Sequence, residues 1–145
     1  MKKFLYCGFV FLFVFLMSGC GAGKTLKCTR DNDYNNQLTM NQKLNIAFKN
    51  DKLSKLTMEM NVSLSDEYVS FKDSLIESAE SEFKDINGKA VSYSTKQSDN
   101  GFTFNVKVNY NKLSDEEKQN LYIVDYEKNY DSIKTELIDA GYDCK

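Results

Sequence analysis

The four cysteines are the residues best suited to chemistry in this 145-residue chain, which has no histidine. The missing histidine removes the commonest general base and the commonest transition-metal ligand at neutral pH. Hydrolase triads that use a histidine base are therefore excluded, and a zinc or copper site would have to use cysteine or carboxylate ligands alone. The positions of the cysteines decide what each of them can do.

The first nineteen residues have the layout of a secretory signal peptide. Lys2 and Lys3 precede an apolar run, 4–17, that is broken only by the small Gly8. Fourteen residues fall short of the roughly 20 that a helix needs to cross the hydrocarbon core. We therefore expect residues 1–19, with Cys7, to be removed rather than to span the membrane.

Cys20 follows two small residues at the end of this run. The sequence Met17-Ser18-Gly19-Cys20 resembles the bacterial lipobox, whose usual form is Leu-(Ala/Ser/Thr)-(Gly/Ala)-Cys. The resemblance implies cleavage after Gly19 and a diacylglyceryl thioether on Cys20. It thus implies a chain anchored by lipid at the extracytoplasmic face of the bacterial cell membrane. Residues 20–24 would be the lipidated N-terminus and a flexible spacer, and 25–145 a single domain.

Cys28 and Cys144 remain near the two ends of that domain. Outside the cytoplasm, two remaining thiols are typical of a disulfide. Such a bridge would close a loop of over a hundred residues, which contributes about 4–5 kcal/mol on the chain-entropy model. Two free thiols are the alternative, because sequence alone constrains pairing weakly.

Two pairs of strands are expected to build the sheet. Apolar residues alternate through 38–49 and 52–64, which predicts an antiparallel hairpin turning at Asn50-Asp51. A second hairpin is expected from 91–97 to 102–110, turning at Asn100-Gly101. A short strand at 25–30 precedes a polar loop at 31–37.

Apolar residues at helical spacing predict three helices, at 65–86, 114–122 and 126–140. Ser65 is the expected N-cap of the first, Ser114 and Glu117 form a capping box, and Gly141 closes the last. The predicted order is (β)ββαββαα. It predicts an α+β two-layer sandwich, with an antiparallel sheet of four to five strands (two hairpins) packed against amphipathic helices.

This order of elements behind a lipobox resembles the YehR-like group of small bacterial lipoproteins. The residues that carry the resemblance are Cys20, the strand pair through 50–53, the helix at 68–83 and the strand at 102–110. The resemblance implies an antiparallel sheet with packed helices, no enzymatic activity and no site residues. The pair Cys28 and Cys144 is not part of it.

Two stretches look like ligand-binding loops but lack a required residue. Residues 18–25 resemble a phosphate-binding loop, yet Ser18 stands where glycine is needed and a helix does not follow. Residues 31–42 resemble a calcium loop, but Asn36 replaces the glycine and Gln42 the bidentate glutamate. We therefore expect no nucleotide and no metal, and an ordinary turn at 31–37.

Other candidate groups have a simpler interpretation. The carboxylates are expected on solvated helix surfaces, the tyrosines at core edges and the methionines as core filler. The carboxylates are Glu80, Glu82, Asp85, Asp115, Glu116 and Glu117. The tyrosines are Tyr93, Tyr110, Tyr122, Tyr126, Tyr130 and Tyr142, and the methionines are Met40, Met58 and Met60.

Charge and composition favour a function without catalysis. The whole chain carries a net charge of −2, and loss of Lys2 and Lys3 leaves 17 basic against 21 acidic residues, or −4. A nucleic-acid partner is not expected. We expect an interaction or accessory module at the cell surface, held to the membrane by lipid on Cys20, with an unidentified protein partner. The alternatives are a binder of a small apolar or peptide ligand between sheet and helices, and a histidine-free carboxylate enzyme.

Overall fold

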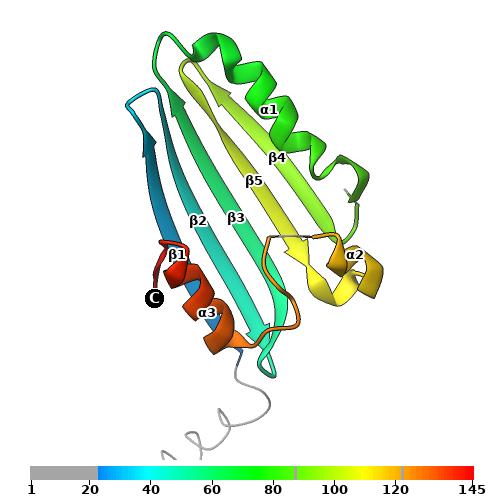
Figure 1. Ribbon diagram of the computed structural model, residues 1–145. Coiled ribbons are helices and arrows are strands. Elements are labelled where there is room, and N and C mark those ends of the chain that lie inside the picture. Colours follow the sequence, from blue (N-terminus) through cyan, green and yellow to red (C-terminus); the bar gives the residue numbers. More distant parts are fainter. Residues whose placement is uncertain (1–22, 87, 122) are drawn as a thin grey trace, which may run out of the picture.

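The computed structural model describes residues 23–86, 88–121 and 123–145, which form one six-stranded antiparallel sheet with helices on one face (Figure 1). The spatial order is β4-β5-β3-β2-β1-β6. The strands are β1 (Lys24–Tyr34), β2 (Leu38–Lys49), β3 (Lys52–Leu64), β4 (Val91–Ser98), β5 (Gly101–Asn109) and β6 (Asp143–Cys144). The α+β class agrees with the prediction, but four to five strands was wrong, because two-residue β6 is too short to show alternation.

The register of the strands separates the sheet into two chemically different faces. Leu26, Ile46, Leu56, Val108 and Val91 lie side by side across five strands, and all five are buried. We call this side the inner face. The neighbouring row points the other way, onto the outer face, and consists of Lys27, Asn45, Thr57, Lys107 and Ser92.

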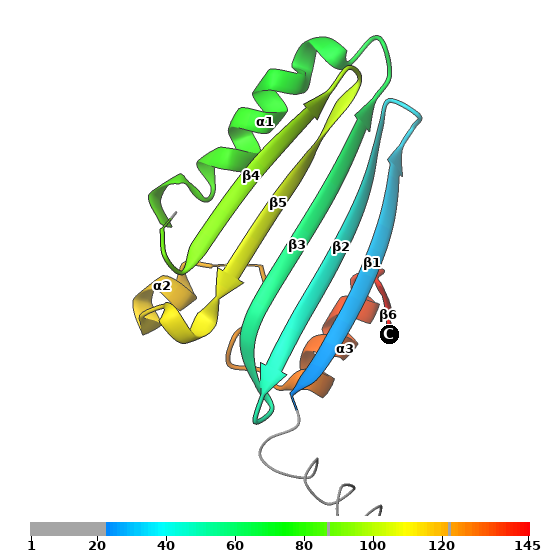
Figure 2. The same cartoon turned by 180° about the vertical axis from the view of Figure 1, so that it is seen from behind.

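All three α-helices lie on the inner-face side. They are α1 (Lys72–Ser81), α2 (Asp115–Gln119) and α3 (Tyr130–Asp139), and 3-10 turns flank them at η1 (Val69–Phe71), η2 (Lys84–Ile86) and η3 (Tyr110–Lys112). α1 contacts β5 near one side of the sheet and α3 contacts β1 near the other. Figure 2 shows the outer face with α3 behind the strands. The fold is therefore a two-layer arrangement whose core lies between sheet and helices.

The β2–β3 hairpin agrees with the prediction at both strands. Asn50 and Asp51 adopt φ of 52° and 60°, as a tight hairpin turn requires. The register shifts after Ala47, where β3 contains Ser54 as an extra residue. The Ser54 hydroxyl donates to the Ala47 carbonyl at 2.9 Å, so the side chain of this buried serine is satisfied inside the bulge.

Strand β1 is longer than predicted, and the polar loop expected at 31–37 was largely wrong. Asp31 and Asp33 belong to β1 and face outward, where their charge is solvated and gives no reason to leave the strand. The turn contains Asn35 and Asn36, with φ of 55° and 58°, values that asparagine tolerates well. The strand also starts at Lys24, inside the predicted spacer.

The β4–β5 turn lies one residue earlier than predicted. Ser98 pairs with Gly101, so Asp99 and Asn100 form the turn and Gly101 belongs to β5. A Cβ on Gly101 would lie 2.0 Å from the Val62 carbonyl oxygen. Glycine is needed here because the β3 backbone approaches closely, rather than for the conformation of the turn.

The helix predicted at 65–86 is broken into η1, α1 and η2. Ser65 does not cap it, because α1 begins after Phe71 and has no side-chain cap. Phe71 is 55% exposed, and the residue of α1 that the core buries is Ile76, outside the predicted stripe. The helix is therefore rotated so that Leu75 and Ala79 point toward a partly open side of the inner face.

Each of the other two helices agrees with the prediction at one end: α2 begins at the predicted capping box but ends at Gln119 instead of near 122, and α3 begins later than predicted but ends before Gly141 as predicted. The capping box of Ser114 and Glu117 opens α2, as predicted. Asn129, rather than a residue near 126, caps α3 by accepting from the Ser132 amide. Gly141 has φ of 88°, and the amides of Gly141 and Tyr142 donate to carbonyls of the last turn, which is a Schellman motif.

Candidate functional site

The two longer helices leave part of the inner face uncovered between them, and a groove of about 880 Å³ lies there. We call it the sheet–helix groove. Its size falls within the range of ligand-binding clefts in proteins. The groove forms because α1 packs against the β5 side of the sheet and α3 against the β1 side, with the strands between them as its floor (Figure 1).

The floor of the groove is apolar and partly exposed. Leu44 and Phe104 are buried there, whereas Met58 and Met60 are only half-buried. Both methionines project from β3 toward the space between the helices. The prediction that they fill the core was therefore incomplete, since each also presents flexible thioether surface to the groove.

Helices and one connecting segment build the walls. Leu75 and Ala79 from α1 face Leu137 from α3 across the floor, and Leu121 and Ile123 close one end. Polar side chains also line the groove, and they supply hydroxyl, amide and carboxylate groups: Gln42, Ser78, Glu82, Asn120 and Tyr142. The site therefore joins an apolar floor to hydrogen-bonding groups around it.

A polar cluster fixes the α3 side of the groove. Gln42 Oε1 accepts from Arg30 Nη2 at 2.7 Å, from Arg30 Nε at 3.1 Å and from the Tyr142 hydroxyl at 3.0 Å. The Arg30 guanidinium lies 4.6 Å from the centroid of the Tyr142 ring. Arg30 Nη1 also donates to the Ala140 carbonyl at 3.1 Å. A cation at the C-terminus of α3 is favourable against the helix dipole and holds that end on the sheet.

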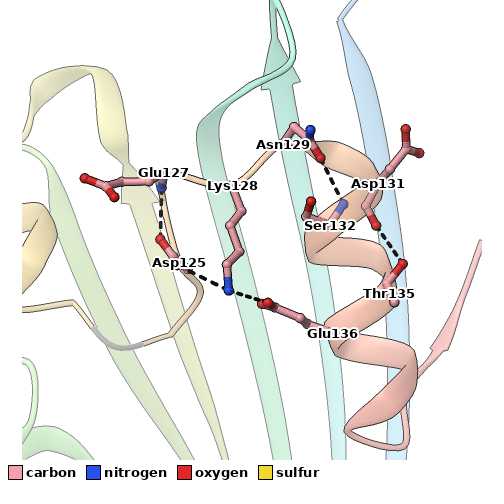
Figure 3. A network of polar contacts seen from close by, with 8 residues as sticks. All are labelled: Asp125, Glu127, Lys128, Asn129, Asp131, Ser132, Thr135 and Glu136. Atoms are coloured by element: carbon pink, nitrogen blue, oxygen red, sulfur yellow. Dashed lines mark hydrogen bonds and ion pairs between the residues drawn. The ribbon is translucent and has the colours of Figure 1, made fainter.

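The other end of α3 is tied to the segment before it (Figure 3). Lys128 Nζ pairs with Glu136 on α3 and with Asp125 Oδ2 at 3.4 Å. The Asp125 carboxylate also accepts from the Glu127 amide at 3.1 Å. The hydrogen bond to Glu136, with Asp125 adding to it, raises the pKa of Lys128. The network explains why α3 begins only at Tyr130, because the preceding residues form a braced turn.

Aromatic rings hold the segment after α1 and the start of α3 against the sheet. Phe83, Tyr93 and Phe104 form a cluster with ring centroids 5.8–6.4 Å apart. Tyr130 makes an edge contact with Phe48 at 5.2 Å, in line with its predicted role in helix–sheet packing. Tyr122 lies outside the described residues. Of the tyrosines considered from sequence, Tyr142 is the one that lines the sheet–helix groove.

Tyr110 is the most unusual tyrosine of the described structure. It is 2% exposed, and its hydroxyl has no hydrogen-bond partner among the described residues. Burial raises the pKa of its phenol to about 12. Because the phenol stays neutral at physiological pH, Tyr110 is a packing residue that carries an unsatisfied hydroxyl.

The structure joins Cys28 and Cys144 in a disulfide between β1 and β6, as predicted. Lys27 and Lys145 exchange backbone hydrogen bonds next to them, so the cysteines occupy the closer, non-hydrogen-bonded position of the antiparallel pair. Their Cα atoms are 4.1 Å apart. The bridge fixes the end of the chain beside the Arg30–Gln42–Tyr142 cluster.

The stretches that resemble a phosphate-binding loop, 18–25, and a calcium loop, 31–42, have ordinary structural roles where the structure describes them. Lys24 and Thr25 begin β1 instead of a helix, and Gln42 binds Arg30. Within residues 23–86, 88–121 and 123–145, no group of three or more acidic or cysteine side chains is placed to hold a metal. Cys20, the predicted lipidation site, lies outside this part of the chain.

The carboxylates considered from sequence are dispersed. Glu80 accepts from the Thr95 hydroxyl, Glu117 completes the α2 capping box, and Glu82 lines the sheet–helix groove. The hydrogen bond from the Ser114 backbone lowers the pKa of Glu117. On the outer face, the hydrogen bond from Lys43 lowers the pKa of Glu59. Glu80, Glu117 and Glu59 each stabilise local structure through these hydrogen bonds.

Comparison with known proteins supports the fold. No protein-family model matches the chain, and no curated protein matches it. The NMR structure of the Escherichia coli YehR protein is similar, with a TM-score of 0.58 and 16% identity over 85% of this chain and 92% of that one. An NMR structure of a protein from Streptococcus pneumoniae TIGR4 has a TM-score of 0.54 and 14% identity over 85% of each chain. The described helices include none long and apolar enough to cross a membrane.

Proposed function

We propose that this chain is a lipid-anchored, non-catalytic binding module whose sheet–helix groove holds an apolar peptide segment of a partner protein. The observation that carries the proposal is the half-buried pair Met58 and Met60 on the groove floor between two helices. Apolar side chains left open to water in this way favour a ligand that completes their burial. Methionine floors adapt to apolar side chains of different shapes.

The polar groups around the groove favour a peptide over a bare hydrocarbon chain. Gln42, Ser78 and Asn120 offer amide and hydroxyl groups beside the apolar floor. A peptide main chain has donors and acceptors that such groups can satisfy, whereas an acyl chain would bury them without partners. The Arg30–Gln42–Tyr142 cluster holds one wall in place, which lowers the ordering cost of binding.

The anchoring part of the proposal rests on the sequence. The lipobox-like segment ending at Cys20 supports export, lipid attachment and a location on the extracytoplasmic face of the bacterial cell membrane. The fold it shares with YehR supports placing the chain in the YehR-like group of small lipoproteins. Absence of histidine supports a module without catalysis, because the commonest general base is missing.

Filling the groove tests the peptide assignment. Ala79→Trp places a large ring on the α1 wall, and Ser74→Trp puts the same ring on an exposed position of α1 that does not line the groove. An array of short apolar peptides, with polar scrambled peptides beside them, serves as the probe. We expect wild type and Ser74→Trp to bind apolar peptides alike, and Ala79→Trp to lose at least about tenfold in affinity.

Two results would contradict this function. One is equal binding of apolar and scrambled peptides by wild type. The other is unchanged affinity in Ala79→Trp while circular dichroism shows the variant folded. Palmitate serves as a competitor, and binding of palmitate without any peptide binding would assign the groove to an acyl chain instead.

Replacing the lipidation cysteine tests the anchor separately. Cys20→Ala removes the thiol that would carry the diacylglyceryl group. We expect the variant to leave the detergent phase or to accumulate as uncleaved precursor, whereas Cys7→Ala behaves as wild type. Detergent-phase partitioning and intact mass measure both outcomes. If the Cys20→Ala variant is cleaved and still partitions into detergent like wild type, lipid on Cys20 is excluded as the anchor.

A further inference from the structure

Lysines gather on one half of the outer face. Lys27 and Lys107 belong to the same cross-strand row, with the neutral Asn45 and Thr57 between them. Lys55 pairs with Asn109 on β5, so it is a diagonal neighbour of Lys107 on the same face. The row therefore extends a positive surface across β1, β2, β3 and β5.

A shallow depression brings three lysines together. It measures about 270 Å³, and Lys55, Lys89 and Lys107 line it with Thr57 and Ser92. Among the described residues that line it, none is acidic. All three lysines are exposed. We call Lys55, Lys89 and Lys107 the lysine triad.

The lysine triad has no ion-pair partner within the described part of the chain. Two acidic residues elsewhere on the outer face, Glu59 and Asp143, pair instead with Lys43 and Lys145. Like charges that face each other across strands are destabilising. A cluster without internal compensation therefore favours an anionic partner outside the chain.

The start of β1 lies at the same end of the sheet as the lysine triad. Lys24 begins β1 beside the β2–β3 turn, toward the end where β4 starts and β5 finishes (Figure 2). Cys20 precedes Lys24 by four residues, and four extended residues span at most about 14 Å. A lipid on Cys20 would thus hold this end of the sheet close to the bilayer surface, near the range of electrostatic attraction at physiological salt.

Several acidic residues lie toward the opposite end of the domain, where Lys72 and Lys96 also occur. Asp31 and Asp33 lie at the far end of β1, and Asp66 and Asp99 occur near the turns at that end. The thirteen residues of β3 place the two ends about 40 Å apart. On the outer face, the lysine triad therefore lies toward the tether and Asp31 and Asp33 lie away from it. The tether end also carries Asp51, which pairs with Lys24, and the acidic first turn of α2 on the inner-face side.

We propose that the lysine triad rests on anionic lipid headgroups and orients the domain on the bilayer that anchors it. This inference rests on the proposed lipid anchor, and it adds the surface and the lipid class that the tether alone does not define. Each lysine near an anionic surface strengthens binding about fivefold. The contact turns the outer face toward the bilayer and leaves the sheet–helix groove on the opposite side of the sheet.

Lysine footprinting on vesicles tests this orientation. The lipidated chain is placed in phosphatidylcholine vesicles or in vesicles that also contain phosphatidylglycerol, and accessible lysines are acetylated and measured by mass spectrometry. We expect labelling of the lysine triad to fall at least about fivefold on the anionic vesicles. Lys72 and Lys96, toward the far end of the domain, should be labelled equally on both. Raised salt should remove the protection.

Charge reversal supplies the matched comparison. K55E/K89E/K107E should abolish the difference between vesicle types, and the control K72E/K96E should keep it. Equal labelling of the lysine triad on both vesicle types, in a chain that stays bound to both, would overturn the inference and leave the anchor intact. Protection by soluble polyphosphate but not by vesicles would overturn it in favour of a soluble polyanion.

Failure of the anchor gives a different pattern. A chain that binds anionic vesicles but not neutral ones would exclude the lipid anchor while supporting the lysine surface. A chain that binds neither would overturn both.

Discussion

The two faces of the sheet use the same strands for opposite purposes. On the inner face, Leu56 is 1% exposed and belongs to a continuous core, whereas its neighbour Thr57 faces solvent on the outer face. The inner face has helices over both sides and a groove between them. The helices that the structure describes leave the outer face open (Figure 2). The register places lysine, threonine, serine, asparagine and glutamate residues on it.

The two faces therefore contribute unequally to stability and to recognition. Burial of the inner face provides most of the free energy of folding, because apolar area removed from water is the dominant favourable contribution. Exposed ion pairs such as Lys43–Glu59 on the outer face contribute about 1 kcal/mol or less. We expect inner-face changes to alter stability strongly, and outer-face changes to alter mainly what the domain contacts.

Removing the disulfide should destabilise the inner face most, since it opens the β1 edge of the core. The Cys28→Ala/Cys144→Ala variant releases a loop of 116 residues, and we expect a loss of about 4–5 kcal/mol in the free energy of unfolding. Urea denaturation measures the loss. Wild-type protein unfolded under reductant should give a similar midpoint. An unchanged midpoint in both would show that the bridge does not stabilise the fold.

Adjacent residues of β3 test the division between faces directly. Leu56→Ala removes a buried side chain and should cost about 2–5 kcal/mol. Thr57→Ala changes the exposed neighbour and should cost less than about 1 kcal/mol. The same denaturation assay compares the two variants. Similar losses in both would mean that the outer face is covered in solution.

Tyr110→Phe should change the free energy of unfolding least at neutral pH, and it tests the buried phenol on the inner side of the sheet. Removing the unsatisfied hydroxyl should stabilise the fold by about 1 kcal/mol. Above pH 10 the unfolded phenol ionises, while the folded phenol keeps its proton until about pH 12. The folded state then binds more protons, so wild-type stability should fall as pH rises, by roughly 3 kcal/mol across that window.

The variant has no phenol at position 110, so its stability should fall less steeply between pH 10 and 12. Thermal unfolding at a series of pH values measures the difference. Parallel profiles for wild type and Tyr110→Phe would show that burial does not raise the pKa of this phenol in the folded state.

Much of the sheet could be predicted from sequence because alternation is a local property. Strands β2 and β3 have the predicted bounds, and Asn50-Asp51 makes the predicted turn. The predicted strand at 25–30 is shorter than β1, because the acidic residues on the solvated face of β1 have the composition of a loop. The pair Asn35-Asn36 was the available signal for its true turn, since asparagine tolerates positive φ.

The groove could not be predicted, because it depends on how far apart the helices lie on the sheet. Met58 and Met60 have the same alternation as core residues, and only the positions of α1 and α3 leave them exposed. In the sequence, Gln42 stands out only because it replaces the glutamate of a calcium loop. Its partners in the structure, Arg30 and Tyr142, come from distant parts of the chain. Contacts between such distant residues leave no local pattern in a single sequence.

The bridge between β1 and β6 has a mechanical consequence for a force applied at the start of β1. Tension that enters at Lys24 meets Cys28 after four residues and is shared there between the first strand and the last. Separation of β1 from β2 should therefore stop close to the start of β1. The disulfide keeps the edge strand β6 attached to β1. If the proposed lipid anchor holds the chain at Cys20, a force on the domain would load β1 and β6 together, and the sheet would resist separation from its β1 edge.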